Sequence, residues 1–194
     1  MKNSDPAIST MKTTKDWNIT CKKAFRNLNA NACDWDTCAQ WKREISRDFY
    51  LAVFDSGNPN PTGLISENAY VSKMNKGKTT HDHYLCPQFI GRMVMDHRDI
   101  YLVDYDKFRE VFWYACRTIV VVQKENDDLS SLTTNDENGF RILVPTDKKY
   151  SHLGIKLYQR EEGRIHWKYA RPIHTDIIDV PEELLEYEVR YLVE

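Results

Sequence analysis

The sequence Thr-Thr-His-Asp-His-Tyr-Leu-Cys-Pro occupies residues 79–87 and joins the pattern of a strand to the start of a helix. Alternation along an extended chain puts His81 and His83 on one face of the strand and Asp82 on the other. Pro87 suits the first turn of a helix, where a backbone N–H is not needed. Strands and helices that follow one another along a chain in this way predict an α+β fold.

On the N-terminal side of this stretch, the sequence predicts a β-hairpin that ends at the histidines. Residues 69–74 have the composition of a short strand, residues 75–77 (Asn-Lys-Gly) that of a turn, and residues 78–85 that of the return strand. Residues 56–63 are rich in Gly, Pro and Asn, and we expect them to form a connection.

A helix is predicted before that connection, capped by Asp34 or Asp36 and running to about residue 54. Its apolar residues recur at steps of three or four, which predicts one buried stripe. The residues of this stripe are Cys38, Trp41, Ile45, Phe49 and Ala52.

The remaining elements are short strands and several helices, and we expect antiparallel hairpins packed with these helices. The helix that starts at Pro87 would bury Phe89, Ile90, Met93 and Val94. Further helices are expected at residues 105–115, 124–129 and 147–153. We expect a polar loop at residues 133–139. Strands are expected at residues 118–122, 140–144, 155–160 and 165–169, the last two forming a hairpin.

Composition predicts one globular domain. The chain has 194 residues, of which 41% are hydrophobic and 29% charged, values typical of folded proteins. We expect a flexible polar N-terminus at residues 1–15, a single α+β domain at residues 16–175, and an acidic amphipathic helix within residues 176–194.

The near-neutral charge hides an acidic C-terminal segment. Residues 176–194 contain seven Asp or Glu and one Arg, which gives this segment a net charge of −6. Because the whole chain has a net charge of −2, the remaining residues carry a net charge of +4. This balance excludes a histone-like basic binder but not an enzyme with a local basic patch. The apolar stripe of the C-terminal segment predicts a docked helix or the contact of a homodimer.

The lack of a recognisable targeting signal and the spacing of the cysteines favour the cytoplasm, or the host cytoplasm if the chain is viral. The five cysteines show no CxxC spacing, which argues against a structural zinc site or a disulfide framework. No apolar leader and no apolar run long enough to cross a bilayer occur, so we expect no membrane partner.

The Asp82-His83 pair has the chemistry of phosphodiester hydrolysis. A carboxylate binds a hard dication through oxygen. A neighbouring imidazole can take a proton from the attacking water, while the cation stabilises charge on the phosphate. Hydrogen bonding within a strand is the structural alternative for the His-Asp-His run.

Asp82-His83, after a predicted hairpin strand and before Pro87, resembles the first element of the HNH, or ββα-metal, nucleases. The resemblance implies a ββα-metal-like core, Asp82 as a ligand of Mg²⁺ or Mn²⁺, and His83 as the general base. It also implies a further ligand on a downstream helix, where Asn126 fits best by residue type and Glu125 or Asp127 could substitute. Helix capping is the structural alternative for these three residues.

The wider pattern from residue 80 to residue 129 is similar to phage-encoded proteins of unassigned role. A nuclease also needs cations for the phosphates, and ordinary surface solubility is the alternative role for the same residues. The candidates for binding nucleic acid are Lys73, Lys76, Lys78, Arg92, Lys168 and Arg171.

The sequence therefore leaves two functions open. The first is a metal-dependent endonuclease of phage origin that hydrolyses phosphodiester bonds in DNA. The second is a non-enzymatic viral accessory or structural protein that acts through protein–protein contacts.

Overall fold

The computed structural model confirms the α+β fold class. Its described residues form eight α-helices, a five-stranded sheet and a separate two-stranded sheet. No helix in the described part of the chain has both the length and the apolar character needed to span a bilayer. The structure describes residues 15–57, 60–130, 133–135, 141–143, 148–160, 168, 170–173 and 184.

The chain forms two compact units, and each is built from two separate segments. One unit combines Met1–Asn60 with Leu85–Arg117 and is called the helical unit below. The other combines Pro61–Tyr84 with Thr118–Glu194 and is called the sheet unit.

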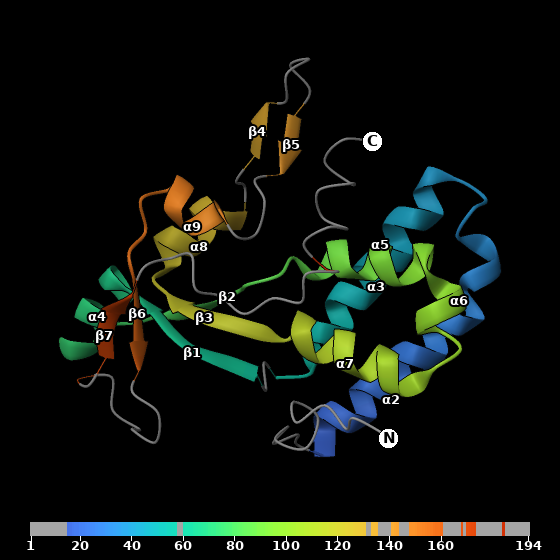
Figure 1. Ribbon diagram of the computed structural model, residues 1–194, viewed down its shortest axis with the longest axis horizontal. Coiled ribbons are helices and arrows are strands. Elements are labelled where there is room, and N and C mark those ends of the chain that lie inside the picture. The colour runs from blue at the N-terminus through green and yellow to red at the C-terminus, as the bar shows by residue number, and fades with distance from the viewer. Residues whose placement is uncertain are drawn as a thin grey trace, which may run out of the picture. The chain divides into compact units, whose positions relative to one another are not determined.

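The helical unit contains five α-helices (Figure 1), and aromatic side chains form its core. Phe49 lies 5.6 Å from Phe112 and 6.2 Å from Phe108 between ring centroids, and Trp17 lies 5.7 Å from Phe112. All four side chains are buried, so the aromatic rings supply much of the apolar area that holds the helices together. The helices are α2 (Lys15–Ala30), α3 (Ala39–Asp55), α5 (Pro87–Asp96), α6 (Arg98–Tyr101) and α7 (Tyr105–Ala115).

The sequence predicts α5 with its buried face, the span of α7, and only part of α3. Every residue expected to face inward on α5 is buried. On α3 the helix starts at Ala39, later than predicted, and Trp41 is 43% exposed. Ile45 and Phe49 of the predicted stripe are buried, and Val53 continues it. Cys38 precedes the helix and is exposed, so the stripe covers only the later turns of α3.

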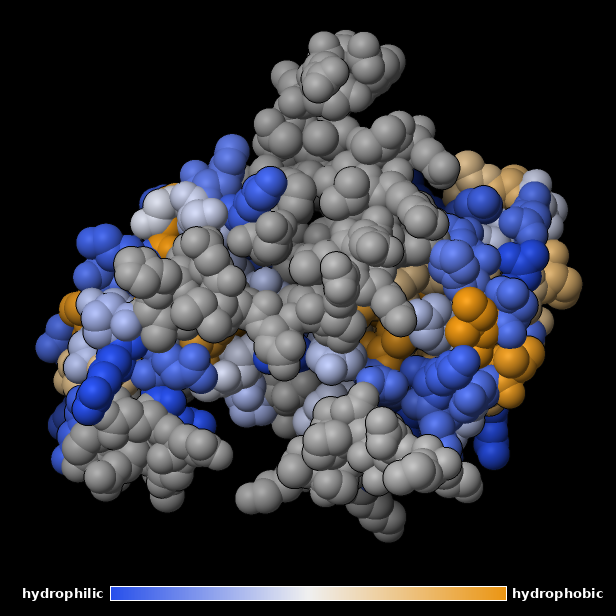
Figure 2. Space-filling view, in the orientation of Figure 1, coloured by the Kyte–Doolittle hydropathy of each residue, from blue (hydrophilic) through white to orange (hydrophobic). Residues whose placement is uncertain are grey.

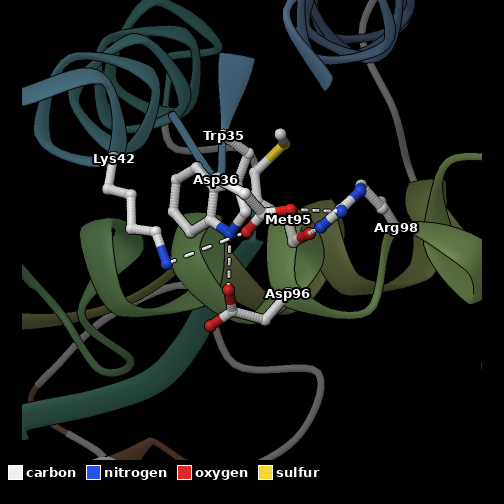
Figure 3. Close-up of polar contacts among 6 residues, drawn as sticks. All are labelled: Trp35, Asp36, Lys42, Met95, Asp96 and Arg98. Carbon is white, nitrogen blue, oxygen red and sulfur yellow. Dashed lines mark hydrogen bonds and ion pairs between the residues drawn. The ribbon is translucent and has the colours of Figure 1, made fainter. Parts of the chain in front are cut away.

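The segment between α2 and α3 is fixed by Trp35 (Figure 3). Its indole Nε1 donates to Asp96 Oδ1 at 2.5 Å, and the side chain is 1% exposed. Lys42 Nζ lies 5.3 Å from the centroid of the Trp35 ring, and Arg98 NH2 lies 2.5 Å from Asp36 Oδ2. A part-buried hydrogen bond, the Lys42 ammonium over the indole ring and the Arg98–Asp36 ion pair therefore hold the segment before α3 against the end of α5.

The sheet unit contains a five-stranded sheet in the order β2-β3-β1-β6-β7. The pairs β2–β3, β1–β6 and β6–β7 are antiparallel. Its strands are β1 (Asn60–Ser66), β2 (Thr80–His83), β3 (Arg117–Val121), β6 (Leu157–Arg160) and β7 (Ala170–Ile173). The unit also contains α4 (Glu67–Met74), α8 (Gln123–Ser130), α9 (Lys149–His152), and the paired strands β4 (Thr133–Asn135) and β5 (Arg141–Leu143).

The predicted hairpin before the histidines is wrong. Residues 69–74 belong to the helix α4, and β2 pairs with β3, with His81 opposite Val120. The side chain of Ser66 caps α4 by accepting from the Ala69 N–H at 3.1 Å. The predicted connection at residues 56–63 overlaps the start of β1. The Ser66 cap therefore starts a helix where the first strand of the hairpin was predicted, and β1 forms where a connection was predicted.

The two faces of the sheet are covered by different helices. Ile65 and Val120 pack with Ala69 of α4 on one face. Alternation turns Ser66 and Asp82 to the other face, where Ser66 contacts α8 and Asp82 contacts α9. Figure 1 shows α8 and α9 next to each other on one side of the sheet. Asp82 therefore points into a covered layer and not into solvent.

Other predictions for this unit had mixed outcomes. The buried strand at residues 118–122, the strand at 140–144 and the helices at 124–129 and 147–153 are confirmed. The predicted polar loop at residues 133–139 contains β4, and β6 pairs with β1 and β7. The predicted strand at residues 165–169 lies outside the described residues, except Lys168. Residues 1–14 and the C-terminal acidic segment lie outside the described residues, except Leu184, which is helical and buried.

Candidate functional site

Asp82 lies in a buried polar contact with two consecutive residues of α9. Lys149 Nζ donates to Asp82 Oδ2 at 2.6 Å, and the Tyr150 hydroxyl donates to the same oxygen. Lys149 Nζ also donates to the backbone carbonyl of His83 at 2.6 Å. The side chains of Asp82 and Lys149 are each 12% exposed, so water screens this ion pair little.

Tyr150 is the deepest member of this group. Its ring stacks on Tyr84 with centroids 6.2 Å apart and an interplanar angle of 6°. Burial, reinforced by the Asp82 carboxylate, raises the pKa of Tyr150 well above its ordinary value. The phenol therefore stays protonated and acts as a hydrogen-bond donor to Asp82.

Glu125 is a second buried carboxylate, and it joins two helix starts. It accepts from Ser66 Oγ at 2.5 Å, from Asn68 Nδ2 at 2.9 Å and from the backbone N–H of Val122 at 3.1 Å. Val122 directly precedes α8, so Glu125 returns to the N-cap of its own helix as in a capping box. Ser66 caps α4, and Glu125 therefore couples the start of α4 to the start of α8.

The structure brings β2 and α8 into contact, which places the predicted metal ligands in neighbouring elements. Asn126 follows Glu125 on α8 and is half-buried; its backbone N–H donates to the Val122 carbonyl at 3.0 Å. The helix-capping alternative considered for residues 125–127 therefore describes the observed role of Glu125.

As arranged, these side chains do not fit a Mg²⁺ or Mn²⁺ centre. The ammonium of Lys149 lies on Asp82, where it repels a second cation. Both oxygens of Glu125 already accept hydrogen bonds. Within the described ranges, no three His, Cys, Asp or Glu side chains are grouped so that they could hold a metal ion.

His81 and His83 lie on the opposite face of β2 from Asp82. His81 is exposed, and its Nδ1 lies 3.3 Å from Thr118 Oγ1. Partial burial of the imidazole and the nearby Lys73 ammonium lower the pKa of His81. His83 is half-buried and pairs in register with Thr118. His83, the predicted general base, therefore shares a sheet face with His81 rather than with Asp82.

The residues predicted to bind nucleic acid are distributed over several elements. Lys78 leads into β2 at one edge of the described sheet, whereas Arg171 lies in β7 at the opposite edge. Lys73 is in α4, and Lys76 lies just beyond it at a backbone φ of 58°. Lys168 is exposed and precedes β7, and Arg92 belongs to α5 of the helical unit.

Sequence reasoning missed the residues that hold the two carboxylates. Lys149 and Tyr150 are 67 and 68 positions from Asp82, and Ser66 is 59 positions from Glu125. A local pattern does not show which distant strand a short helix will cover. The only local signal is that Lys149 and Tyr150, two consecutive residues with polar groups at the ends of long side chains, lie in a predicted helical turn.

A second candidate site lies in the helical unit, in a groove between α2 and α3 of about 280 Å³. The α3 side carries Leu51, which is 43% exposed, between the carboxylates of Asp48 and Asp55. The groove is lined by Thr20, Lys23, Ala24, Asn27, Leu28, Asp48, Phe49, Leu51, Ala52 and Asp55.

Comparison with known proteins identifies no relative. No protein-family model, no curated protein and no solved structure matches the chain.

Proposed function

We propose that the protein acts by binding another protein through the groove between α2 and α3, and not by catalysis at Asp82 and His83. The observation that carries this proposal is the groove itself, where an exposed leucine lies between two exposed carboxylates. The sequence left open a protein that acts through protein–protein contacts. The groove between α2 and α3 is the surface that we propose for such a contact.

The groove has the periodicity that accepts a helix. Asp48, Leu51 and Asp55 follow one another at steps of three and four on α3 and so lie on one side of it. Seven residues of helix rise about 10 Å, which is therefore the spacing of the two carboxylates along the groove. An amphipathic helix binds such a surface by placing apolar residues at the same steps of three and four.

Charge selects the chemistry of the partner. Asp48 and Asp55 are exposed, and neither forms an ion pair with another described residue. Lys23 is the one cation among the lining residues of this groove, so the lining carries a net negative charge. The groove therefore fits a basic amphipathic helix with Lys or Arg residues seven positions apart on either side of an apolar residue.

The surrounding surface is consistent with a small, selective contact. Phe54 is 59% exposed and Ile19 is 55% exposed, on the two helices that form the groove. On the face drawn in Figure 2 the described residues are mostly hydrophilic, and hydrophobic residues form small separate areas. A partner would therefore gain affinity from a few apolar anchors, such as Leu51, and from charge.

The test uses a fluorescent synthetic helix with a leucine face and two lysines seven positions apart, titrated with the protein and followed by anisotropy. We expect saturable binding that weakens with salt, because exposed charges are screened. Asp48→Lys with Asp55→Lys should weaken binding at least about tenfold, since like charges then face each other.

Glu44→Lys is the matched control, because Glu44 is exposed on the same helix and does not line the groove. It should leave the affinity unchanged. A peptide with glutamates in place of the two lysines should not bind. Equal losses in the groove variant and in Glu44→Lys would rule out the groove and indicate nonspecific attraction.

The endonuclease is the second candidate, favoured by the packing of β2 on α8, which places Asp82 next to the helix that carries Asn126. It would require Lys149 to leave Asp82. Plasmid DNA and RNA would be incubated with the protein and Mg²⁺, with or without EDTA. Cleavage that needs Mg²⁺ and is lost in His83→Ala would support it. Intact substrates with the wild-type protein would exclude it under those conditions.

A further inference from the structure

We propose that His81 and His83 together form a binding site for a transition-metal dication of the Ni²⁺ and Zn²⁺ class. This site is separate from the Mg²⁺ centre implied by the nuclease resemblance, and it does not depend on the proposed groove function. It uses the face of β2 opposite to Asp82.

The register of β2 places the two imidazoles on one side of the sheet. His81 pairs with Val120 and His83 with Thr118, so the two residues are successive members of the same face. Their Cα atoms are therefore about 7 Å apart along the strand, a separation from which two imidazoles can reach one ion. Asp82 points the other way and is held by Lys149, so it does not compete for the ion.

Thr118 orients one of the two ligands. Its Oγ1 lies 3.3 Å from His81 Nδ1, and Thr118 is 1% exposed on the neighbouring strand. A hydrogen bond at Nδ1 leaves Nε2 as the nitrogen that can bind a metal. Metal-binding histidines commonly use the second ring nitrogen in this way, because the hydrogen bond fixes the tautomer and the ring direction.

The donor set decides which ions bind. Imidazole suits the borderline transition metals, whereas Mg²⁺ requires oxygen ligands. With two protein ligands the ion keeps open coordination positions for water.

One neighbouring charge opposes cation binding. Lys73 lies near enough to His81 to act on it electrostatically, and its ammonium repels the incoming ion. Removing this charge should therefore tighten binding, an effect that a metal bound elsewhere on the chain would not show.

The experiment is a calorimetric titration of the full chain with NiCl₂. It uses a background in which the exposed thiols are removed by Cys33→Ser and Cys38→Ser, because free thiolates also bind such ions. We expect one Ni²⁺ per chain. His81→Ala and His83→Ala should each weaken binding at least about tenfold, and Thr118→Val should weaken it while both ligands remain. Lys73→Gln should strengthen binding.

His152→Ala is the matched control, because His152 is an exposed histidine on α9, and it should bind Ni²⁺ like the parent protein. Circular dichroism spectra check that each variant folds, and Thr118→Val and Lys73→Gln keep the test informative if a histidine variant does not. No binding by the parent, or equal losses in His152→Ala and His83→Ala, would overturn the proposal.

Discussion

At the scale of single residues, Glu125 shows how one side chain can satisfy several elements. It is 7% exposed and accepts from Ser66, Asn68 and the Val122 backbone. The sequence allowed two roles for residues 125–127, a metal ligand or a helix cap. The cap could be predicted from the position of an acid in the first turn, whereas Ser66 could not, because it is far away in the sequence.

Replacing Glu125 by Gln tests this role. In place of Oε1 the amide NH₂ would face Asn68 Nδ2, and in place of Oε2 it would face the Ser66 hydroxyl and the Val122 N–H, so at least one donor would lose its acceptor. We expect a loss of about 2 kcal/mol in the free energy of unfolding, measured by urea denaturation. Asp128→Asn removes an exposed ion pair with Lys124 at 2.8 Å and should cost less than about 1 kcal/mol. Equal losses for the two variants would contradict the buried role of Glu125.

At the scale of elements, α3 and α5 approach so closely that a glycine is required. A Cβ added at Gly91 would lie 2.9 Å from Phe49 Cβ and 3.1 Å from Phe49 Cγ. Phe49 is 1% exposed in the aromatic core, so it has little room to move. Helix interiors otherwise prefer alanine to glycine by about 1 kcal/mol, and here the contact reverses that preference.

We therefore expect Gly91→Ala to lower the free energy of unfolding by about 1–3 kcal/mol, measured by urea denaturation. Phe49→Ala combined with Gly91→Ala should cost less than the sum of the two single losses, because alanine lacks the Cγ and Cδ1 atoms that the new methyl group meets. A gain in stability for Gly91→Ala alone would show that α3 and α5 can separate without cost.

The same scale shows why some elements could be predicted and others could not. The helices α5 and α7 carry apolar residues at steps of three and four, and this local pattern persists in the fold. In contrast, β1 contains Pro61 and Gly63, so its sequence predicts a connection. It is nevertheless a strand because β3 and β6 flank it on both sides, and neither neighbour can be recognised from β1 alone.

At the scale of the whole molecule, strand order is the property that the sequence did not supply. β2 pairs with β3 and not with the segment before it, and β1 lies next to β6 from near the end of the described chain. These pairings give Asp82 its surroundings, because they decide which face α8 and α9 cover. The acid and its strand could be predicted, but its buried partners could not.

The interrupted order of the two units also has a consequence for synthesis on the ribosome. The helical unit is complete in sequence once Arg117 has been made, whereas the sheet unit still lacks β6 and β7. Tyr158 and its hydrogen-bond partner Glu67 are 91 positions apart. At translation rates of about 5–20 residues per second, the first strand made would wait roughly 5–20 s for that neighbour. During this interval the edge of β1 that later pairs with β6 has no partner strand, and such an edge can pair with other chains.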